Sequence, residues 1–108
     1  MLTDAKKELK WEERQVLRGL KRAATESLEY HQRQIGDMDD RRALMCGSPI
    51  TPNVFFAVQV FAVKLSIGTV KYRLNKLHKS GHVLKHTTRG GHCCWWPVGL
   101  ADDLRSKA

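Results

Sequence analysis

Cysteines and long apolar runs are scarce in this sequence. Its 108 residues include three cysteines, an odd number and too few for the disulfide framework of a small secreted domain. The longest apolar stretch, residues 54–63, is interrupted by Gln59 and is shorter than the roughly 18 residues that cross a bilayer. No apolar stretch follows the charges of residues 1–8, so we expect no secretory signal. These absences predict a cytoplasmic protein without a membrane anchor.

Acidic residues are missing from a large part of the chain, since none occurs between residues 43 and 101. Residues 43–108 hold nine lysines and arginines against Asp102 and Asp103, a net charge of +7, whereas residues 1–42 are nearly neutral at +1. This segregation favours a second half that faces a polyanion, and the usual polyanions are nucleic acid and an anionic membrane surface. A basic surface that only improves solubility is the alternative. The composition, 42% apolar and 28% charged, is that of a globular chain and not of a disordered one.

Residues 4–35 contain no proline and are rich in helix formers, which predicts a long helix. Apolar side chains recur every seven residues along it, but polar residues interrupt the seam, so the pattern does not indicate a coiled coil. The apolar face packs either on the rest of the chain or on a second copy. Gly19 lowers helix stability by about 1 kcal/mol relative to alanine and marks either a break or a close helix contact. A short helix is expected over residues 39–45.

Two further helices are expected in the second half. Thr51 fits an N-cap and Pro52 the first helical position of a helix through residues 53–64, which are apolar almost all round and predict a buried helix. Ser66 fits the N-cap of the next helix, and Gly81 its end. That helix carries one stripe at a spacing of i, i+4, i+7, formed by Val70, Leu74 and Leu77.

A β-hairpin is expected after these helices. Residues 82–87 and 92–96 are typical of two strands, and residues 88–91, Thr-Arg-Gly-Gly, of the turn between them. Residues 100–107 predict a short final helix that packs beside the amino-terminal one.

The histidines and cysteines near the hairpin do not predict a metal site. The three histidines of residues 78–86 are spaced four apart, but Gly81 ends the helix between them, so they share no helical face. Cys93 and Cys94 are adjacent in a strand and point to opposite sides, and we expect one of them to pack inward. No arrangement typical of nucleophilic or acid–base catalysis is present. We therefore expect no metal, no cofactor and no enzymatic activity.

The helix over residues 66–79 and the hairpin after it carry a resemblance to a known family. The pattern reads Ser66-x-x-Thr69-Val70-x-x-x-Leu74-x-x-Leu77-x-x-x-Gly81-x-Val83. Together with a hairpin whose tip is basic and rich in glycine, it resembles the recognition helix and wing of winged helix-turn-helix DNA-binding domains. The resemblance covers residues 48–98 and identifies no subfamily. Two positions depart from the family pattern: Val60 replaces a small residue, and Lys64 replaces the usual glycine of the turn.

The resemblance implies an α+β fold, namely a winged helix-turn-helix with a long amino-terminal helical extension and a carboxy-terminal β-hairpin wing. Residues 1–47 are then the helical region for support or dimerisation, residues 48–99 the helix-turn-helix and wing, and residues 100–108 a short helix or tail. The first helix of the usual three is expected in residues 25–35 or 39–45.

The resemblance also implies a mode of DNA binding. The recognition helix lies in the major groove, where Lys71 reads guanine and Asn75 reads adenine. Thr69 and Tyr72 meet a phosphate or a thymine methyl group, and Arg73 contacts a phosphate or forms a surface ion pair. The wing reaches the backbone or the adjacent minor groove. The DNA-binding residues expected in this way are Ser66, Gly68, Thr69, Lys71, Tyr72, Arg73, Asn75, Lys76, Lys79, Lys85, Arg89 and Gly90.

The function expected from these features is sequence-specific binding of double-stranded DNA by a homodimer that uses its amino-terminal helices. Such a protein would be a transcriptional regulator, a repressor of a bacterium, phage or plasmid, cytoplasmic and located on the nucleoid when bound. No small-molecule effector and no membrane partner is indicated. A replication, partition or architectural factor is one alternative. A protein-binding adaptor is another, with the helix over residues 54–63 and an exposed Trp95 or Trp96 as its contact, while the other tryptophan anchors the hairpin.

Overall fold

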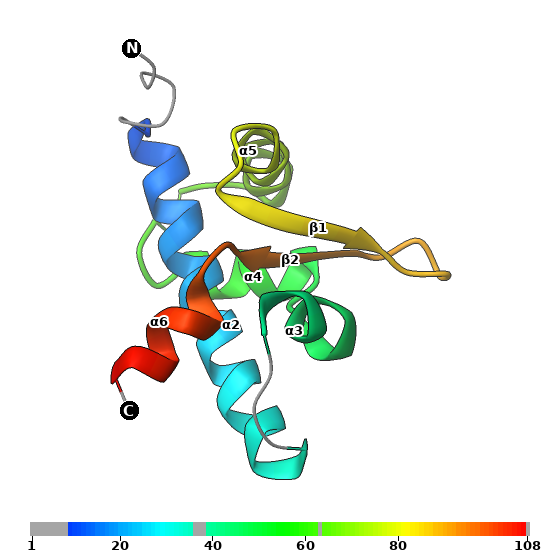
Figure 1. The fold of residues 1–108 in the computed structure, drawn as a ribbon. Coiled ribbons are helices and arrows are strands. Elements are labelled where there is room, and N and C mark those ends of the chain that lie inside the picture. The colour runs from blue at the N-terminus through cyan, green and yellow to red at the C-terminus, as the bar shows by residue number, and fades with distance from the viewer. Residues whose placement is uncertain (1–8, 36–38, 63, 108) are drawn as a thin grey trace.

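Helices surround a two-stranded hairpin in the computed structural model, which describes residues 9–35, 39–62 and 64–107 (Figure 1). The elements in chain order are α2 (Trp11–Ile35), α3 (Asp40–Gly47), α4 (Thr51–Val58), α5 (Ile67–Lys79), β1 (Val83–Thr87), β2 (Cys93–Pro97) and α6 (Leu100–Lys107). The strands pair antiparallel, from Val83 opposite Pro97 to Thr87 opposite Cys93. The expected α+β class is confirmed. Over the described residues, no helix has the length and apolar character needed to cross a membrane.

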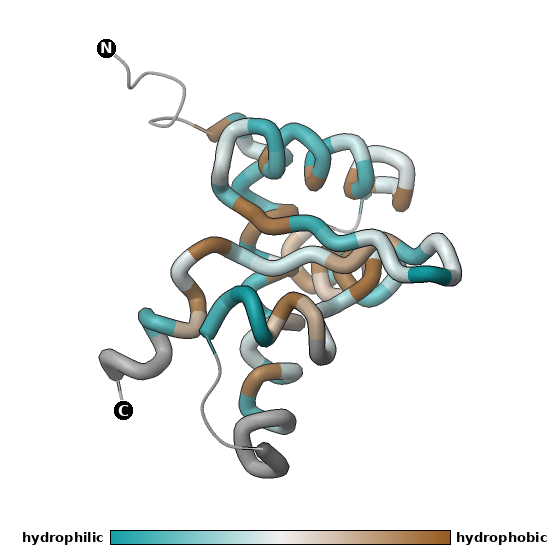
Figure 2. Tube along the Cα trace, turned by 45° about the vertical axis from the view of Figure 1, so that its right-hand side comes forward, coloured by the Kyte–Doolittle hydropathy of each residue, from teal (hydrophilic) through white to brown (hydrophobic). Residues whose placement is uncertain are grey.

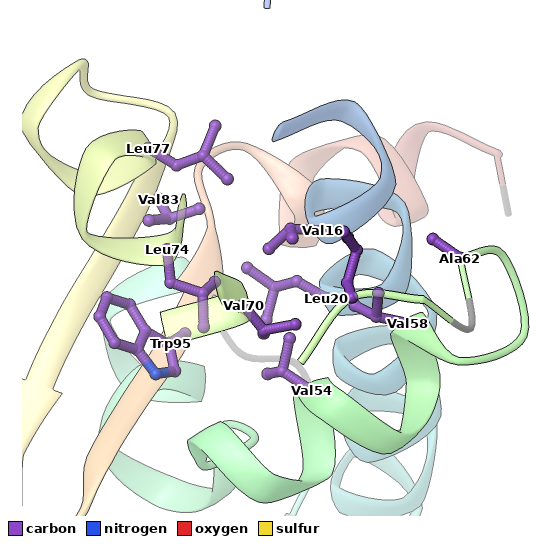
Figure 3. Close-up of a cluster of buried hydrophobic side chains, with 11 residues drawn as sticks. Val16, Leu20, Val54, Val58, Ala62, Val70, Leu74, Leu77, Val83 and Trp95 are labelled. Atoms are coloured by element: carbon purple, nitrogen blue, oxygen red, sulfur yellow. The ribbon is translucent and has the colours of Figure 1, made fainter. Parts of the chain in front are cut away.

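Two hydrophobic clusters share the hairpin between them. The larger cluster joins α2, α4 and α5 to the hairpin (Figure 3) and contains Val16, Leu20, Val54, Val58, Ala62, Leu65, Val70, Leu74, Leu77, Val83 and Trp95. The smaller cluster contains Ala24, Leu28, Ala43, Trp96, Leu100 and Ala101. Successive residues of a strand point to opposite sides, so Trp95 and Trp96 enter different clusters. They are 0% and 1% exposed, and the expectation that one tryptophan is exposed is wrong.

Helix α2 runs unbroken through Gly19, where it touches α4. A Cβ at Gly19 would stand 2.4 Å from Cγ2 of Val58 and 2.8 Å from the backbone nitrogen of Val58, so the close helix contact is confirmed and the break is not. The expected start of this helix at residue 4 lies outside the described residues. Through Val16 and Leu20, the amino-terminal half of α2 packs in one cluster with α4 and α5. The helix segment that packs on α4 and α5 in this way is the amino-terminal half of α2, which precedes residues 25–35 of the same helix, and it is not residues 39–45.

Replacing Gly19 with alanine is expected to destabilise the protein by about 2 kcal/mol, because the overpacked contact costs more than the helix propensity gains. The same substitution at Gly68 is the matched control, since a Cβ there meets only the Ser66 hydroxyl at 3.9 Å. Gly68→Ala is expected to leave stability unchanged or raise it by up to about 1 kcal/mol. Urea unfolding of the two variants measures this difference, and equal midpoints would contradict the close packing of α2 on α4.

The start of α4 differs from the sequence expectation. Its N-cap is Ile50, and Thr51 is already helical, with Pro52 next to it. The Thr51 hydroxyl accepts a hydrogen bond of 2.9 Å from the indole nitrogen of Trp95 and so holds the hairpin instead of capping the helix. Ile50 also forms an isolated antiparallel bridge with Cys94, so the segment before α4 lies along β2.

The end of α4 also differs, because the helix stops at Val58 and not at residue 64. The side-chain amide of Gln59 donates a hydrogen bond of 3.2 Å to the backbone oxygen of Leu65 and so ties the end of the helix to the turn before α5. Val54 and Val58 are fully buried, but Phe56 between them is 69% exposed. The prediction of a helix buried all round is therefore wrong, and α4 has an apolar face that its own chain leaves uncovered.

Helix α5 and the hairpin follow the sequence expectations. The Ser66 hydroxyl accepts a hydrogen bond from the backbone nitrogen of Thr69, which confirms the N-cap. Gly81 ends the helix at a φ of +85°, and Gly91 forms the hairpin tip at a φ of +86°, both in the region that favours glycine. The expected inward stripe is confirmed by the burial of Val70, Leu74 and Leu77.

Helices α3 and α6 confirm the two short helices expected at these places, and one carboxylate joins them to the hairpin. Asp39 caps α3. The next residue, Asp40, accepts hydrogen bonds from the Trp96 indole nitrogen at 2.9 Å and from the backbone nitrogens of Gly99 at 2.6 Å and Ala101 at 2.9 Å. A single side chain therefore fixes the end of β2 and the start of α6.

Candidate nucleic-acid interface

The outer face of α5 carries exposed cations opposite its buried stripe. Because a helix repeats every 3.6 residues, burying residues 70, 74 and 77 turns Lys71, Tyr72, Lys76 and Lys79 outward, and all four are exposed. Figure 2 shows the same division, with hydrophilic and hydrophobic positions alternating along α5 at the top of the view. The sequence offers no acidic residue between positions 43 and 101 to balance these charges.

Tyr72 lies between two cations on this face. The guanidinium carbon of Arg73 is 5.2 Å from the centre of the tyrosine ring, and the ammonium of Lys76 is 5.7 Å from it, both within the range of a cation–π contact. The ring nevertheless stays 55% exposed. An open hollow of about 340 Å³ is bordered by Tyr72, Asn75, Lys76 and Lys79. An aromatic ring and two ammonium groups therefore meet at one accessible place.

Asn75 is engaged inside the protein at both ends of its side-chain amide. Its nitrogen donates to the backbone oxygen of Lys71 at 3.1 Å, and its oxygen accepts from the ammonium of Lys85 at 3.0 Å. The Lys85 ammonium also lies 5.3 Å from the centre of the Trp95 ring. The structure thus places Lys85 of β1 against α5, and it engages the oxygen and one amide hydrogen of Asn75 inside the protein.

Arg73 is held by two glutamates from the start of α2. Its guanidinium contacts Glu12 at 2.8 Å and Glu13 at 3.2 Å, and its side chain is only 17% exposed. Burial lowers the pKa of Arg73, but the hydrogen bond to Glu12 and the charges of both glutamates outweigh it, so the pKa is raised above its ordinary value. Of the two roles considered for Arg73, the structure has the ion pair and not an arginine open to a phosphate.

In the first turn of α5, two hydroxyl groups form the helix cap and the glycine is exposed. The Ser66 hydroxyl accepts from the Thr69 backbone nitrogen at 3.2 Å and bonds the Thr69 hydroxyl at 3.1 Å, so both side chains serve the cap. Gly68 is exposed, and a Cβ there would meet nothing closer than 3.9 Å. The backbone at Gly68 is therefore accessible to a close partner.

The hairpin tip lies beside the start of α5. Within the tip, the Gly91 nitrogen donates to the Thr88 backbone oxygen at 3.0 Å, and the His92 nitrogen donates to the Thr88 hydroxyl at 3.1 Å. Arg89 and Gly90 are exposed between them. An open hollow of about 320 Å³ joins the tip to the starts of α4 and α5, and residues around it include Thr51, Gly68, Lys71, Gly91, His92 and Cys93.

His92 and Cys93 had not been expected at this site. Their position directly after the glycine-rich turn is the sequence signal that could have identified them. Cys94 is buried and Cys93 is partly buried, which confirms that one of the two cysteines packs inward. Across the described ranges, no three side chains of the His, Cys, Asp and Glu types gather as metal ligands would.

The structure thus places Lys71, Tyr72, Lys76 and Lys79 together on the outer face of α5, called the basic surface below, and leaves Arg89 exposed at the hairpin tip. Of the other expected residues, Ser66, Thr69, Arg73, Asn75 and Lys85 form hydrogen bonds within the protein, and Gly68 and Gly90 are exposed. Comparison with known proteins finds no counterpart: no family model, no curated protein and no solved structure matches the chain. The chemistry of the basic surface is therefore the basis for assigning a function.

Proposed function

We propose that the protein binds double-stranded DNA through the basic surface and regulates transcription as a winged helix-turn-helix repressor. The observation that carries the proposal is the outer face of α5. Its exposed cations come from residues 43–101, which include no acidic residue, and the start of the helix shares a hollow with a glycine-rich hairpin tip. The order of the elements also supports it, since two successive helices, α4 and α5, are followed directly by a hairpin, as the resemblance to that family implies.

In this proposal α5 enters the major groove with its amino-terminal half nearest the bases. Lys71 donates to the acceptor edge of guanine, and Tyr72 contacts a thymine methyl group. Lys76 and Lys79, one to two turns further along, neutralise phosphates and set the position of the helix. Arg89 at the hairpin tip reaches the adjacent minor groove, where the negative potential favours a cation.

Three residues that the sequence placed at the DNA take a positioning role instead. Asn75 joins Lys85 of β1 to the backbone of Lys71 in α5, so the hairpin and the recognition helix keep one relative position. Arg73, held by its two glutamates, fixes α5 to the start of α2. A site on elements that are fixed in this way loses less entropy when it binds.

The alternatives differ in what they require of the structure. A replication, partition or architectural factor would use the same basic surface without selecting a promoter. The adaptor role combined an exposed Trp95 or Trp96 with the helix over residues 54–63; both tryptophans are buried, but Phe56 of that helix is exposed, so only the helix is available for such a contact. An absence of DNA binding would favour this role. The decisive property is therefore selectivity among DNA sequences.

Fluorescence anisotropy with random and genomic duplexes tests the proposal on the 108-residue chain. We expect log affinity to fall by about 0.9 per phosphate contact for each unit of log salt. Fragments selected from genomic DNA are expected to converge on sites upstream of genes. Binding without a salt slope would contradict the electrostatic basis, and convergence on no site would favour the architectural alternative.

Replacing Lys71 and Tyr72 together with alanine is expected to remove most of the selectivity, because these residues face the bases in the proposed complex. A good side chain–base pair is worth about 1–3 kcal/mol of discrimination, so the preference for the selected site falls by roughly 10- to 100-fold. The control is Lys21→Ala, an exposed cation on α2 outside the basic surface. Unchanged selectivity in the double variant would refute the placement of the recognition helix.

A further inference from the structure

A second kind of hollow lies outside the basic surface, between α2 and α4. It is an open groove of about 720 Å³ between the carboxy-terminal half of α2, the segment after α3 and the outer face of α4. Residues around it include Ala23, Ser27, Tyr30, Pro49, Phe56 and Ala57. Phe56 is the most exposed of the large hydrophobic residues that the structure describes, at 69%, and Tyr30 is 58% exposed. Exposed apolar surface of this kind is typical of a contact with another protein surface.

The rim of the groove carries one charge of each sign. Arg22 and Glu26 lie one turn apart on α2, and their closest charged atoms are 4.0 Å apart. Their side chains are 51% and 71% exposed, so the pair is open to water and contributes little to stability on its own. A nucleic acid would gain nothing from such a rim, because Glu26 offsets the attraction of Arg22. A second copy of the chain presents the same two charges and can match both.

The groove combines a protruding aromatic side chain with a neighbouring space lined by small side chains. Phe56 projects from α4, while Ala23 and Ala57 leave space beside it because their side chains are small. A twofold interface needs this combination, since each copy must offer what the other accepts. If two α2 helices cross antiparallel at the groove, Arg22 of one copy faces Glu26 of the other, and the reverse pair forms at the same time. The charges and the shape of the groove therefore both complement a second copy.

Such a contact leaves the basic surface free. In Figure 1, α5 lies beside the amino-terminal part of α2, whereas the carboxy-terminal half of α2 extends to the other end of the molecule. The contacts agree, because Glu12 and Glu13 reach α5 while Ala24 and Leu28 pack in the smaller cluster with α6. Two copies joined through the groove would each keep α5 and the hairpin tip accessible.

We propose that the groove between α2 and α4 is the surface through which two copies of this chain associate, each placing Phe56 against the groove of the other. The sequence predicts a homodimer that uses the amino-terminal helices but does not predict which face they present. The groove supplies that face. It does not depend on DNA binding, because the association is measured without nucleic acid. Failure of the proposed DNA binding would therefore leave it standing, and the reverse also holds.

Sedimentation equilibrium of the full chain without DNA tests the proposal. The wild-type chain is expected to be a dimer at about 100 µM, and Phe56→Asp is expected to weaken the dimer at least 100-fold, the size of effect that a central aromatic contact has. Val98→Asp is the matched control, because Val98 is exposed at 50% outside the groove and the same charge is introduced. It is expected to remain dimeric. Circular dichroism is expected to match the wild type for both variants, since neither site is buried, and thermal unfolding is expected to match at concentrations low enough for every chain to be monomeric.

A charge exchange tests the antiparallel arrangement. Arg22→Glu gives a rim with two acids and Glu26→Arg a rim with two bases, so each variant alone is expected to dimerise about tenfold more weakly. A mixture of the two variants restores both cross-pairs and is expected to form a heterodimer as stable as the wild-type dimer. A wild-type chain that stays monomeric, a dimeric Phe56→Asp, or a mixture that does not associate would overturn the proposal.

Discussion

Replacing Lys76 and Lys79 with alanine is expected to lower the affinity for double-stranded DNA by about 60-fold at 0.1 M salt. Each lysine that neutralises a phosphate contributes about 0.9 to the slope of log affinity against log salt, so two such contacts at 0.1 M are worth about 1.8 units of log affinity, or roughly 60-fold. Both side chains are exposed on the outer face of α5, where no buried contact is lost. The loss is expected to be the same for every DNA sequence, because a phosphate contact carries no base information.

Anisotropy titrations at several salt concentrations check this prediction through a slope that falls by about two. The control is the pair Lys21→Ala and Arg41→Ala, which removes the same charge from exposed positions on α2 and α3. That control is expected to change the affinity less than about threefold, because charges outside the contact act only through a screened field. A control as damaging as the Lys76 and Lys79 variant would mean that net charge, and not the basic surface, holds the DNA.

The features that the sequence predicted correctly are those with local causes. The cap at Ser66 and the glycine at Gly81 fix the ends of α5 within a few residues, and the apolar spacing fixes its inner face. The glycine-rich turn at Gly91 fixes the register of the hairpin. Because these signals act over short distances, the outward positions of Lys71 and Lys76 followed from the sequence as well.

The features that the sequence did not predict depend on partners far along the chain. Arg73 had two possible roles, and only the packing of α2 on α5 brings Glu12 and Glu13, some sixty residues earlier, to its guanidinium. The engagement of Asn75 by Lys85 likewise depends on how the hairpin leans on α5. No local pattern encodes such contacts, so the sequence alone did not show that Arg73 and Asn75 are engaged inside the protein.

The apolar pattern of α4 misled the sequence analysis for a related reason. A run of apolar residues normally indicates burial, yet the fold covers only the side that carries Val54 and Val58 and leaves Phe56 exposed. An apolar pattern in the sequence shows which side chains avoid water, but it does not show whether the same chain or a second copy covers them. In the proposed dimer the groove accounts for this difference, so the error at α4 and the inferred contact have one cause.

Replacing Asp40 with alanine is expected to destabilise the protein by about 3–5 kcal/mol, the largest effect that we expect from a single side chain. The substitution removes three hydrogen bonds to one carboxylate, those from Trp96, Gly99 and Ala101. Trp96 is only 1% exposed, so its indole N–H loses its partner without gaining water. A buried donor left without a partner costs about 1–3 kcal/mol, and the start of α6 loses its anchor in addition.

Thermal unfolding is expected to show a midpoint lower by roughly 15 °C for Asp40→Ala, given about 4 °C per kcal/mol for a chain of this size. Asp103→Ala is the matched control, because that exposed aspartate in the first turn of α6 contributes at most about 1 kcal/mol through the helix dipole. Trp96→Phe removes the indole donor itself. If the hydrogen bond carries the effect, the double variant Asp40→Ala, Trp96→Phe is less unstable than the sum of the single variants by about 1–2 kcal/mol. Full additivity, or an Asp40→Ala midpoint equal to that of Asp103→Ala, would show that the carboxylate does not join α3, β2 and α6 in solution.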